Sequence, residues 1–389
     1  MTEGALQDIR ILDLTDERGI YGAKLLADLG ADVVRPEPPG GDPLRQRGPH
    51  ADAAGAGATS LWHAFFASNR RCFIVDVDRV EGAQQLSALA AGADIILTCD
   101  QAYGVDQLEL DALAAAKPAL VIVNTSSFGQ SGPWRDFLAP DLVAGALGGA
   151  VATTGDVDTP PLKSFGELNF MVSGTYVAIA ALAALFSARQ TGAGQQADVS
   201  VHETIVSCLE QVLMFYWYAD RLMRPSKILP RQGATHWSNA YTVMNGRNGS
   251  IMVTPTPDFD NQLAWLIEEE AHGDLIDPKY MAPENLGLRV ERTMELLREW
   301  VADKDVETLF HEAQERHCPY GWVLPIERVA DNPQLDARQW YQPYQIGQAE
   351  VTSPGAPYRF SETPWQLKPH SGPADEAAAV LADIGWGVS

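Results

Sequence analysis

The chain has 389 residues, of which 46% are hydrophobic and 20% are charged, and its formal net charge is −23. This length allows two domains with separate cores, and the composition is that of a folded globular protein. The negative charge argues against nucleic acid and anionic membranes as partners, because both would repel the protein.

The first 130 residues alternate between strand-like and helix-like segments. The apolar patterns predict strands at 9–14, 32–35, 94–98 and 119–124, and helices at 21–29, 82–91 and 107–116. Gly30 follows the first helix as its C-terminal cap. Strands linked through helices in this rhythm pair in parallel, so we expect a Rossmann-like α/β domain. Ligands of such sheets lie outside the carboxyl ends of the strands.

The middle of the chain is predicted to be helical over 171–189 and 199–223. The aromatic residues 215–218 in the second helix are expected in a core or a subunit interface. The apolar run 171–186 is interrupted by polar residues and is too short for a bilayer, so we expect no membrane span. Changes in composition predict a large domain formed by 1–220 and 320–389, and a smaller α+β domain at 221–319.

The N-terminus has neither the basic nor the apolar region of a signal peptide, so we expect a cytoplasmic protein. Cys72, Cys99, Cys208 and Cys318 lie far apart without a CxxC pair, which argues against a zinc site or a disulfide framework. We therefore expect no bound metal.

Several motifs occur in a characteristic order. Gly166–Gly174 leads into the apolar helix, residues 191–200 read TGAGQQADVS, and residues 124–133 form a Gly-rich loop. This layout resembles the class III CoA-transferases, which include formyl-CoA transferase, carnitine CoA-transferase and α-methylacyl-CoA racemase. The resemblance implies an interlocked dimer whose substrates are an acyl-CoA and a carboxylic acid, with no cofactor besides the CoA thioester.

The resemblance also implies which residues bind CoA. Asn69, Arg70 and Arg71 match a family stretch close to the CoA phosphates, where paired guanidinium groups suit a diphosphate. The sequence without the resemblance favours two solvated arginines, and the resemblance favours the phosphate site. The remaining implied CoA-binding residues are Thr98, Ser126, Phe128, Gly129 and Gln130.

The position of the family nucleophile decides the mechanism. Class III transferases attack the thioester with an Asp that stands four residues before the Gly of the helix, and Phe170 occupies that place here. Glu167 is the nearby carboxylate in the sequence. It is a candidate for a displaced nucleophile, or it interacts with the helix dipole instead.

Three functions follow from these observations. The chain is a CoA-transferase, either active through an unusual residue or acting as the non-catalytic subunit beside a paralogous chain. Alternatively, it is an acyl-CoA racemase or isomerase, although Pro140, Phe170 and Thr242 do not fill the racemase pattern and leave His236 as a lone candidate. The third alternative is a CoA-ester-binding protein without catalysis.

Overall fold

The computed structural model describes residues 4–52, 58–155, 159–218, 221, 242–254, 259–347, 349–370, 382 and 386. The chain divides into two compact units. The first unit consists of Met1–Gly148, Ser164–Cys208 and Pro333–Ser389, and the second of Gly149–Lys163 and Leu209–Asn332. His236 lies outside the described residues.

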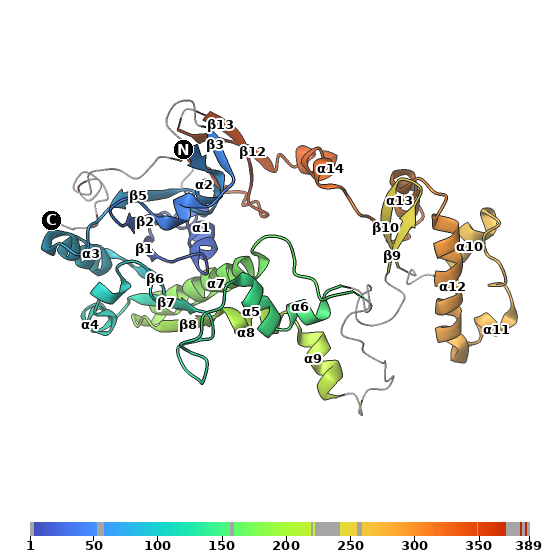
Figure 1. Cartoon of the computed structure of the whole chain (residues 1–389), viewed down its shortest axis with the longest axis horizontal. Coiled ribbons are helices and arrows are strands. Elements are labelled where there is room, and N and C mark those ends of the chain that lie inside the picture. The colour runs from blue at the N-terminus through green and yellow to red at the C-terminus, as the bar shows by residue number, and fades with distance from the viewer. Residues whose placement is uncertain are drawn as a thin grey trace. The chain divides into compact units, whose positions relative to one another are not determined.

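A parallel six-stranded sheet forms the centre of the first unit (Figure 1). Its order is β5-β2-β1-β6-β7-β8. The strands are β1 (Arg10–Leu14), β2 (Asp32–Glu37), β5 (Arg70–Ile74), β6 (Ile95–Cys99), β7 (Val121–Ser126) and β8 (Gln196–Ser200). The predicted α/β class with parallel pairing is confirmed.

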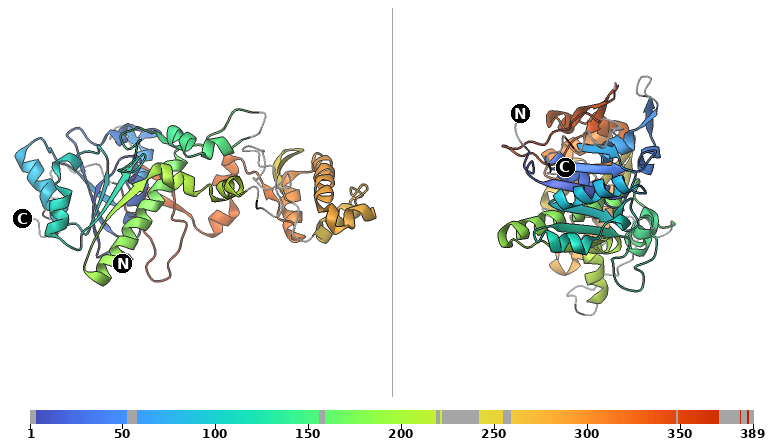
Figure 2. Two further views of the ribbon diagram at one scale, coloured as in Figure 1. Left: turned by 90° about the horizontal axis from the view of Figure 1, so that it is seen from below. Right: turned by 90° about the vertical axis from the view of Figure 1, so that its left-hand side faces the viewer.

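Helices cover both faces of this sheet (Figure 2). On one face, α1 (Ile20–Asp28) and α7 (Leu168–Thr191) pack on alternate strand residues such as Ile11 and Ile95. On the other face, α3 (Val80–Gly92) and α4 (Leu110–Ala116) pack on the intervening residues such as Leu12 and Ile96. This alternation follows from the two-residue period of a strand.

The remaining elements of the first unit are short. They are η1 (Pro43–Gln46), β3 (His50–Asp52), β4 (Ala58–Ser60), α2 (Leu61–Phe66), η2 (Val105–Gln107), α5 (Asp141–Leu147), α8 (Val201–Ser207), α15 (Pro333–Ala337), β12 (Tyr341–Ile346) and β13 (Ala349–Pro354). β12 and β13 form an antiparallel pair. The Tyr344 hydroxyl donates to the carbonyl of Ala64, which joins this pair to α2.

The helix predicted at 199–223 is wrong in its extent. Residues 196–200 add β8 to the edge of the sheet, and α8 ends before a separate helix α9 (Glu210–Trp217). Pairing with β7 overrides the local helical pattern at Val199, and the Ser200 hydroxyl accepts from the Glu203 N–H to start α8. Tyr216, Trp217 and Tyr218 are exposed, so these aromatic side chains are not core residues of this chain.

Helix α7 passes a length and composition test for crossing a bilayer, alone among the helices in the described part of the chain. Its packing is that of a core helix, because Val177, Ala181 and Ala184 belong to the buried cluster beneath the sheet. It approaches α1 closely at two glycines. A Cβ atom on Gly174 would lie 2.7 Å from the Gly22 nitrogen.

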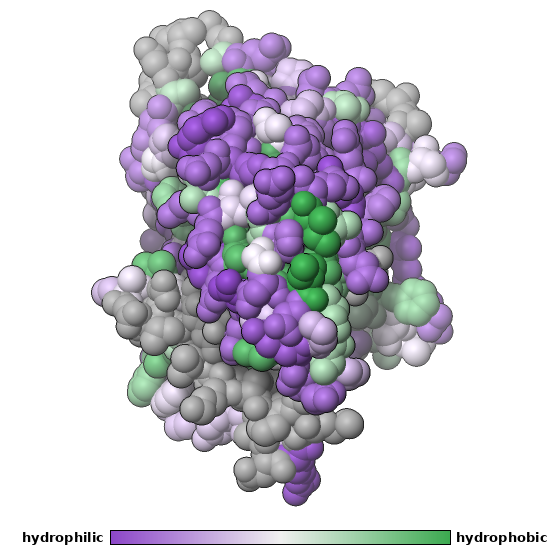
Figure 3. Space-filling view, turned by 90° about the vertical axis from the view of Figure 1, so that its right-hand side faces the viewer, coloured by the Kyte–Doolittle hydropathy of each residue, from purple (hydrophilic) through white to green (hydrophobic). Residues whose placement is uncertain are grey.

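The second unit has its own core around Trp265, Leu297 and Tyr320. It contains α6 (Ala150–Thr153), α9, β9 (Thr242–Gly246), β10 (Gly249–Val253), α10 (Phe259–Glu268), α11 (Pro278–Met281), η4 (Pro283–Asn285), α12 (Leu286–Val301), α13 (Val306–Glu315), β11 (Gly321–Trp322) and α14 (Ile326–Ala330). One face of the molecule is largely hydrophilic with a small hydrophobic patch (Figure 3), as the acidic composition requires of a solvated surface.

Candidate functional site

A cavity of about 670 Å³ opens beyond the carboxyl ends of β1, β6 and β7. Its lining comes from the segments that follow these strands, from the loop before α5 and from the start of α7: Asp16, Glu17, Arg18, Asp100, Gln101, Ser127, Gln130, Arg135, Asp136, Phe137, Leu138, Ala139, Pro140 and Phe170. Parallel strands end together at this edge, which is where open α/β sheets bind ligands. We refer to it as the carboxyl-edge cavity.

A smaller cavity of about 230 Å³ adjoins the carboxyl-edge cavity, with which it shares Asp16, Glu17 and Gln101. Pro36, Pro38 and Tyr103 are among its other lining residues. Because they share lining residues, the two cavities lie next to each other along the ends of the strands, and we refer to them together as the groove.

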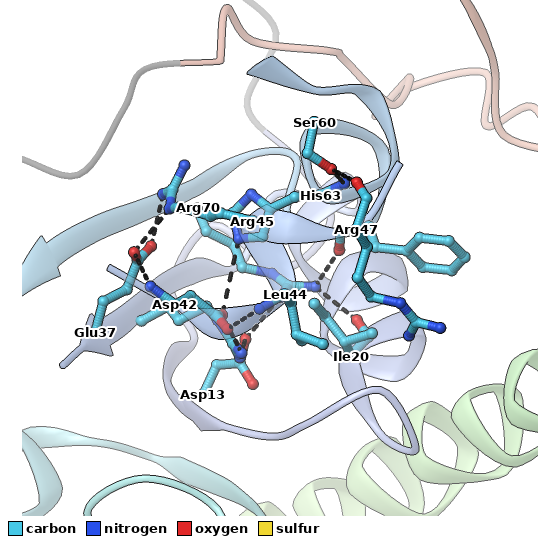
Figure 4. Close-up of polar contacts among 12 residues, drawn as sticks. Asp13, Ile20, Glu37, Asp42, Leu44, Arg45, Arg47, Ser60, His63 and Arg70 are labelled. Carbon is cyan, nitrogen blue, oxygen red and sulfur yellow. Dashed lines mark hydrogen bonds and ion pairs between the residues drawn. The ribbon is translucent and has the colours of Figure 1, made fainter. Parts of the chain in front are cut away.

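Asp13, Arg35 and Asp42, which line the smaller cavity, belong to a buried network of charges, and Figure 4 shows polar contacts of this region. Asp13 Oδ2 accepts from Arg35 Nη1 at 3.0 Å and from Arg70 Nη1 at 2.7 Å. Arg35 also donates to Asp42 Oδ2 at 2.6 Å. Burial would raise the pKa of Asp13, but Arg70 and Arg35 outweigh it and lower this pKa. The network therefore keeps its carboxylates ionised without solvent.

Neither Arg70 nor Arg71 is a lining residue of the two cavities. Arg70 has a fully buried side chain that donates to Asp13 and to the carbonyls of Ile20 and Phe66. Arg71 forms an ion pair with Asp32. Both arginines open β5, at the amino end of the strand, whereas the cavities lie at the carboxyl edge. A phosphate contact by Arg70 would require this side chain to leave its buried partners.

Asn69 connects two parts of the first unit. Its Nδ2 donates to Asp28 Oδ1 and to the Gln366 carbonyl, and its Oδ1 accepts from the Lys368 N–H. Its φ of 59° places it in the left-handed region, which Asn tolerates better than most residues. In this structure Asn69 fixes the C-terminal segment to the end of α1.

The other predicted CoA-binding residues lie at or behind the carboxyl edge. Gln130 lines the cavity, and the sequence analysis missed its neighbour Ser127, which also lines it. Thr98 and Ser126 are buried at the carboxyl ends of β6 and β7 and line neither cavity. Phe128 is buried behind Ser127, and Gly129, at φ 86°, makes the turn that presents Gln130.

Phe170 lines the carboxyl-edge cavity from the first turn of α7, and it is only 4% exposed. Its N–H donates to Asp141 Oδ2 at 3.1 Å, and Asn169 Nδ2 donates to Asp141 Oδ1 at 3.0 Å. Asp141, the first residue of α5, therefore satisfies N-terminal groups of α7 and fixes position 170. The benzyl ring presents an apolar wall at this point.

Glu167, the predicted alternative nucleophile, is not among the residues that line the cavity. Its carboxylate forms an ion pair with Arg47, and the Arg47 guanidinium lies 4.4 Å from the centre of the Trp62 ring. Sequence analysis missed this contact because Arg47 and Glu167 are 120 residues apart. The carboxylate is thus held by a cation rather than directed at the cavity.

Within the described residues, no three His, Cys, Asp or Glu side chains gather in a way that could hold a metal ion. The chemistry available at the carboxyl-edge cavity is that of hydrogen-bond donors such as Ser127 and Gln130, of paired charges and of an apolar wall.

Comparison with known proteins places this fold and groove in a family. The profile of CoA-transferase family III matches residues 6–377. The chain is 30% identical over 371 residues to the succinyl-CoA:(R)-benzylsuccinate CoA-transferase subunit BbsE of Thauera aromatica, covering 92% of this chain and 88% of the relative. It is 27% identical over 339 residues to the succinyl-CoA–D-citramalate CoA-transferase of Chloroflexus aurantiacus, covering 86% and 82%.

A solved structure shows the same fold. A CAIB/BAIF family protein from Brucella suis superposes with a TM-score of 0.83 at 24% identity, covering 99% of this chain and all of the other. The molecule is thus an α/β protein with a groove at the carboxyl edge of its parallel sheet. The chain belongs to CoA-transferase family III. The resemblance identified in the sequence is confirmed, and the racemase alternative is not favoured.

Proposed function

We propose that this protein is a subunit of a heteromeric CoA-transferase, in which a paralogous chain supplies the nucleophilic carboxylate. The single observation that carries the proposal is Phe170 in the wall of the carboxyl-edge cavity. Transfer through an acyl anhydride needs an oxygen lone pair within attack distance of the thioester carbon, and the benzyl ring offers none at the position where the family nucleophile stands. Asp16, Glu17, Asp100 and Asp136 also line the cavity, but none of them stands at that position. The ion pair of Glu167 with Arg47 supports the same reading, because this carboxylate already has a cationic partner.

Two relatives are consistent with a heteromer. One is named as a subunit of a benzylsuccinate CoA-transferase, and another, 26% identical over 373 residues, as the alpha subunit of a succinyl-CoA–L-malate CoA-transferase. The substrates we propose are an acyl-CoA and a free carboxylic acid, with no further cofactor. We also propose that the protein acts in the cytoplasm.

The proposed CoA site is the groove formed by the two cavities, with the thioester end in the larger cavity beside Phe170. Contact of Arg71 with the CoA phosphates stays a prediction. In that case Arg71→Met would weaken CoA binding about tenfold or more, the usual effect of losing a charge-assisted hydrogen bond. Unchanged affinity in calorimetry would show that Arg71 does not contact the phosphates.

Exposed apolar side chains support an obligate interface with a second chain. In the first unit, Leu168, Ile179 and Phe186 of α7 are between 48% and 65% exposed. Such large side chains along one helix are rarely left in water. We propose that they are covered by the paralogous chain or by a second copy. A monomer in sedimentation at micromolar concentration, alone and with the paralogue, would contradict this.

Three variants test the role of position 170. The purified chain should show no transfer and form no covalent CoA adduct by mass spectrometry, whereas adding the paralogous chain should give turnover. Phe170→Asp should introduce slow transfer, and Phe170→Asn, of equal size but without a nucleophile, should not. Turnover by the wild-type chain alone that disappears in Glu167→Gln while CoA binding persists would refute the subunit proposal.

A further inference from the structure

The lining of the carboxyl-edge cavity combines residues of two chemical kinds. The apolar residues, called the apolar side below, are Phe137, Leu138, Ala139, Pro140 and Phe170. Phe137 is 55% exposed and Leu138 77% exposed, so their side chains are free to contact a ligand in this chain. This side matches an apolar group better than a hydrated one, because burial of apolar surface is favourable.

An aromatic cluster supports the apolar side. Phe137 stacks on Trp134 with ring centroids 6.3 Å apart and an angle of 15° between the planes. Phe128 meets both rings edge-on, at 6.3 Å from Phe137 and 5.5 Å from Trp134. Phe128 is itself buried, so the exposed rings rest on a fixed base. A further ring entering the cavity would find an aromatic partner in a favourable edge or offset geometry.

The other lining residues include four carboxylates, from Asp16, Glu17, Asp100 and Asp136, and the guanidinium groups of Arg18 and Arg135. Both guanidinium groups already have acidic partners. Arg18 donates to both oxygens of Asp16 and to the Asp100 carbonyl, and Arg135 donates to Asp136 at 3.2 Å. The cavity therefore has a surplus of negative charge.

Asp100 is one of these carboxylates. Burial raises the pKa of its carboxyl, Arg18 and Arg135 oppose this shift, and the nearby charges of Asp198 and Asp16 add to it. A second carboxylate brought into this space by a ligand would meet the same repulsion. An acyl group without a free carboxylate would not be repelled in this way.

We infer that the acid carried in this cavity is a monocarboxylic acid with an aromatic or branched apolar body, rather than a dicarboxylic acid. The inference rests on the proposed function, because it assumes that a CoA thioester lies in the groove. As a thioester, such an acid has no remaining charge to meet the four carboxylates, and its body lies against Phe137 and Leu138. The cavity of about 670 Å³ is within the usual range for a ligand of this size.

Calorimetry on the full chain tests the inference with three probes: CoA, phenylacetyl-CoA and succinyl-CoA. We expect phenylacetyl-CoA to bind at least about tenfold more tightly than succinyl-CoA. Its phenyl ring gains contacts with the aromatic cluster, whereas the free carboxylate of succinyl-CoA is repelled by the acidic residues of the cavity. Phe137→Ala should remove most of the preference by weakening phenylacetyl-CoA alone. Asp136→Asn should reduce the difference in affinity between the two esters by strengthening the binding of succinyl-CoA. Leu142→Ala, an exposed site outside the cavity lining, is the matched control and should change neither affinity.

The outcomes separate the two proposals. Equal binding of both esters, or tighter binding of succinyl-CoA, would overturn the inferred substrate class while leaving a CoA site in place. Tighter binding of succinyl-CoA would mean that Arg18 or Arg135 exchanges its acidic partner for the ligand carboxylate. Absence of binding by all three probes, with the chain folded by circular dichroism and assembled with its paralogue, would refute the CoA site and the inference together.

Discussion

Replacing Arg70 tests whether this arginine serves the fold or the ligand. Arg70→Met keeps much of the side-chain volume but removes the guanidinium group. Asp13 then retains Arg35 as its one arginine partner, and the carbonyls of Ile20 and Phe66 lose their donor. All of these groups are buried in the first unit. Removing one partner of a buried ion pair typically costs about 3–5 kcal/mol when the other charge stays without compensation. Because Asp13 keeps Arg35, we expect a cost towards the lower end of this range.

The adjacent Arg71 offers a matched control. Its ion pair with Asp32 is partly exposed, with 34% and 28% of the two side chains accessible. Pairs of this kind contribute about 0–1 kcal/mol. Arg71→Met therefore makes the same chemical change one residue along β5, with a much smaller expected effect on the free energy of unfolding.

Urea unfolding followed by circular dichroism, at one fixed protein concentration, measures the difference. We expect the urea concentration at the midpoint of the first unfolding transition to fall by at least about 1 M in Arg70→Met, from the usual dependence of unfolding free energy on urea. The midpoint of Arg71→Met should stay close to that of the wild type. If Arg70→Met unfolds like the wild type but loses CoA affinity, the reasoning from its buried contacts is refuted and Arg70 is a ligand residue.

Two further predictions concern packing in the first unit. His63 and His370 are buried 5.7 Å apart, and burial, followed by the nearby His63, lowers the pKa of His370 from 6.5 to about 3. Because the unfolded chain binds this proton at a higher pH than the folded chain, the free energy of unfolding should fall as the pH drops from about 6.5 towards 3, by about 2 kcal/mol at pH 5. In urea unfolding at several pH values, His370→Asn should reduce this pH dependence, whereas the control His311→Gln, at an exposed histidine, should keep it. The same pH dependence in the wild type and both variants would contradict the argument. Gly174→Ala should lower the free energy of unfolding by about 1–3 kcal/mol, because its Cβ would lie 2.7 Å from the Gly22 nitrogen in the α1–α7 contact. A thermal unfolding midpoint equal to that of the wild type would show that α1 and α7 accommodate the added methyl group without cost.

The sequence alone was sufficient for the fold class and the family. Apolar strands such as 9–14 and 94–98, separated by helical segments, are local patterns, and parallel pairing follows from their order. The role of Gly30 as the cap of the first helix was also predictable, because its φ of 99° is one that glycine, having no Cβ, adopts readily. Phe170 was identified through the family resemblance, because it stands four residues before Gly174, where the family has its Asp.

The extent of the elements was less predictable where a neighbour competed with local propensity. Residues 196–200 form β8 because β7 offers a free edge, which no local pattern reveals. The two-residue period of a strand places Arg70 and Arg71 on opposite faces of the sheet. The sequence motif suggested a shared ligand, whereas the strand geometry gives them different partners.

The tertiary structure decided which charges meet. Arg70 and Asp13 are 57 residues apart, and Arg47 and Glu167 are 120 residues apart, yet each pair forms an ion pair. The same holds for the carboxyl-edge cavity, whose lining comes from the ends of separate strands and from the start of α7. Electrostatic energy depends on distance in space and on burial, so a sequence reveals which charges are available but not which of them neutralise one another.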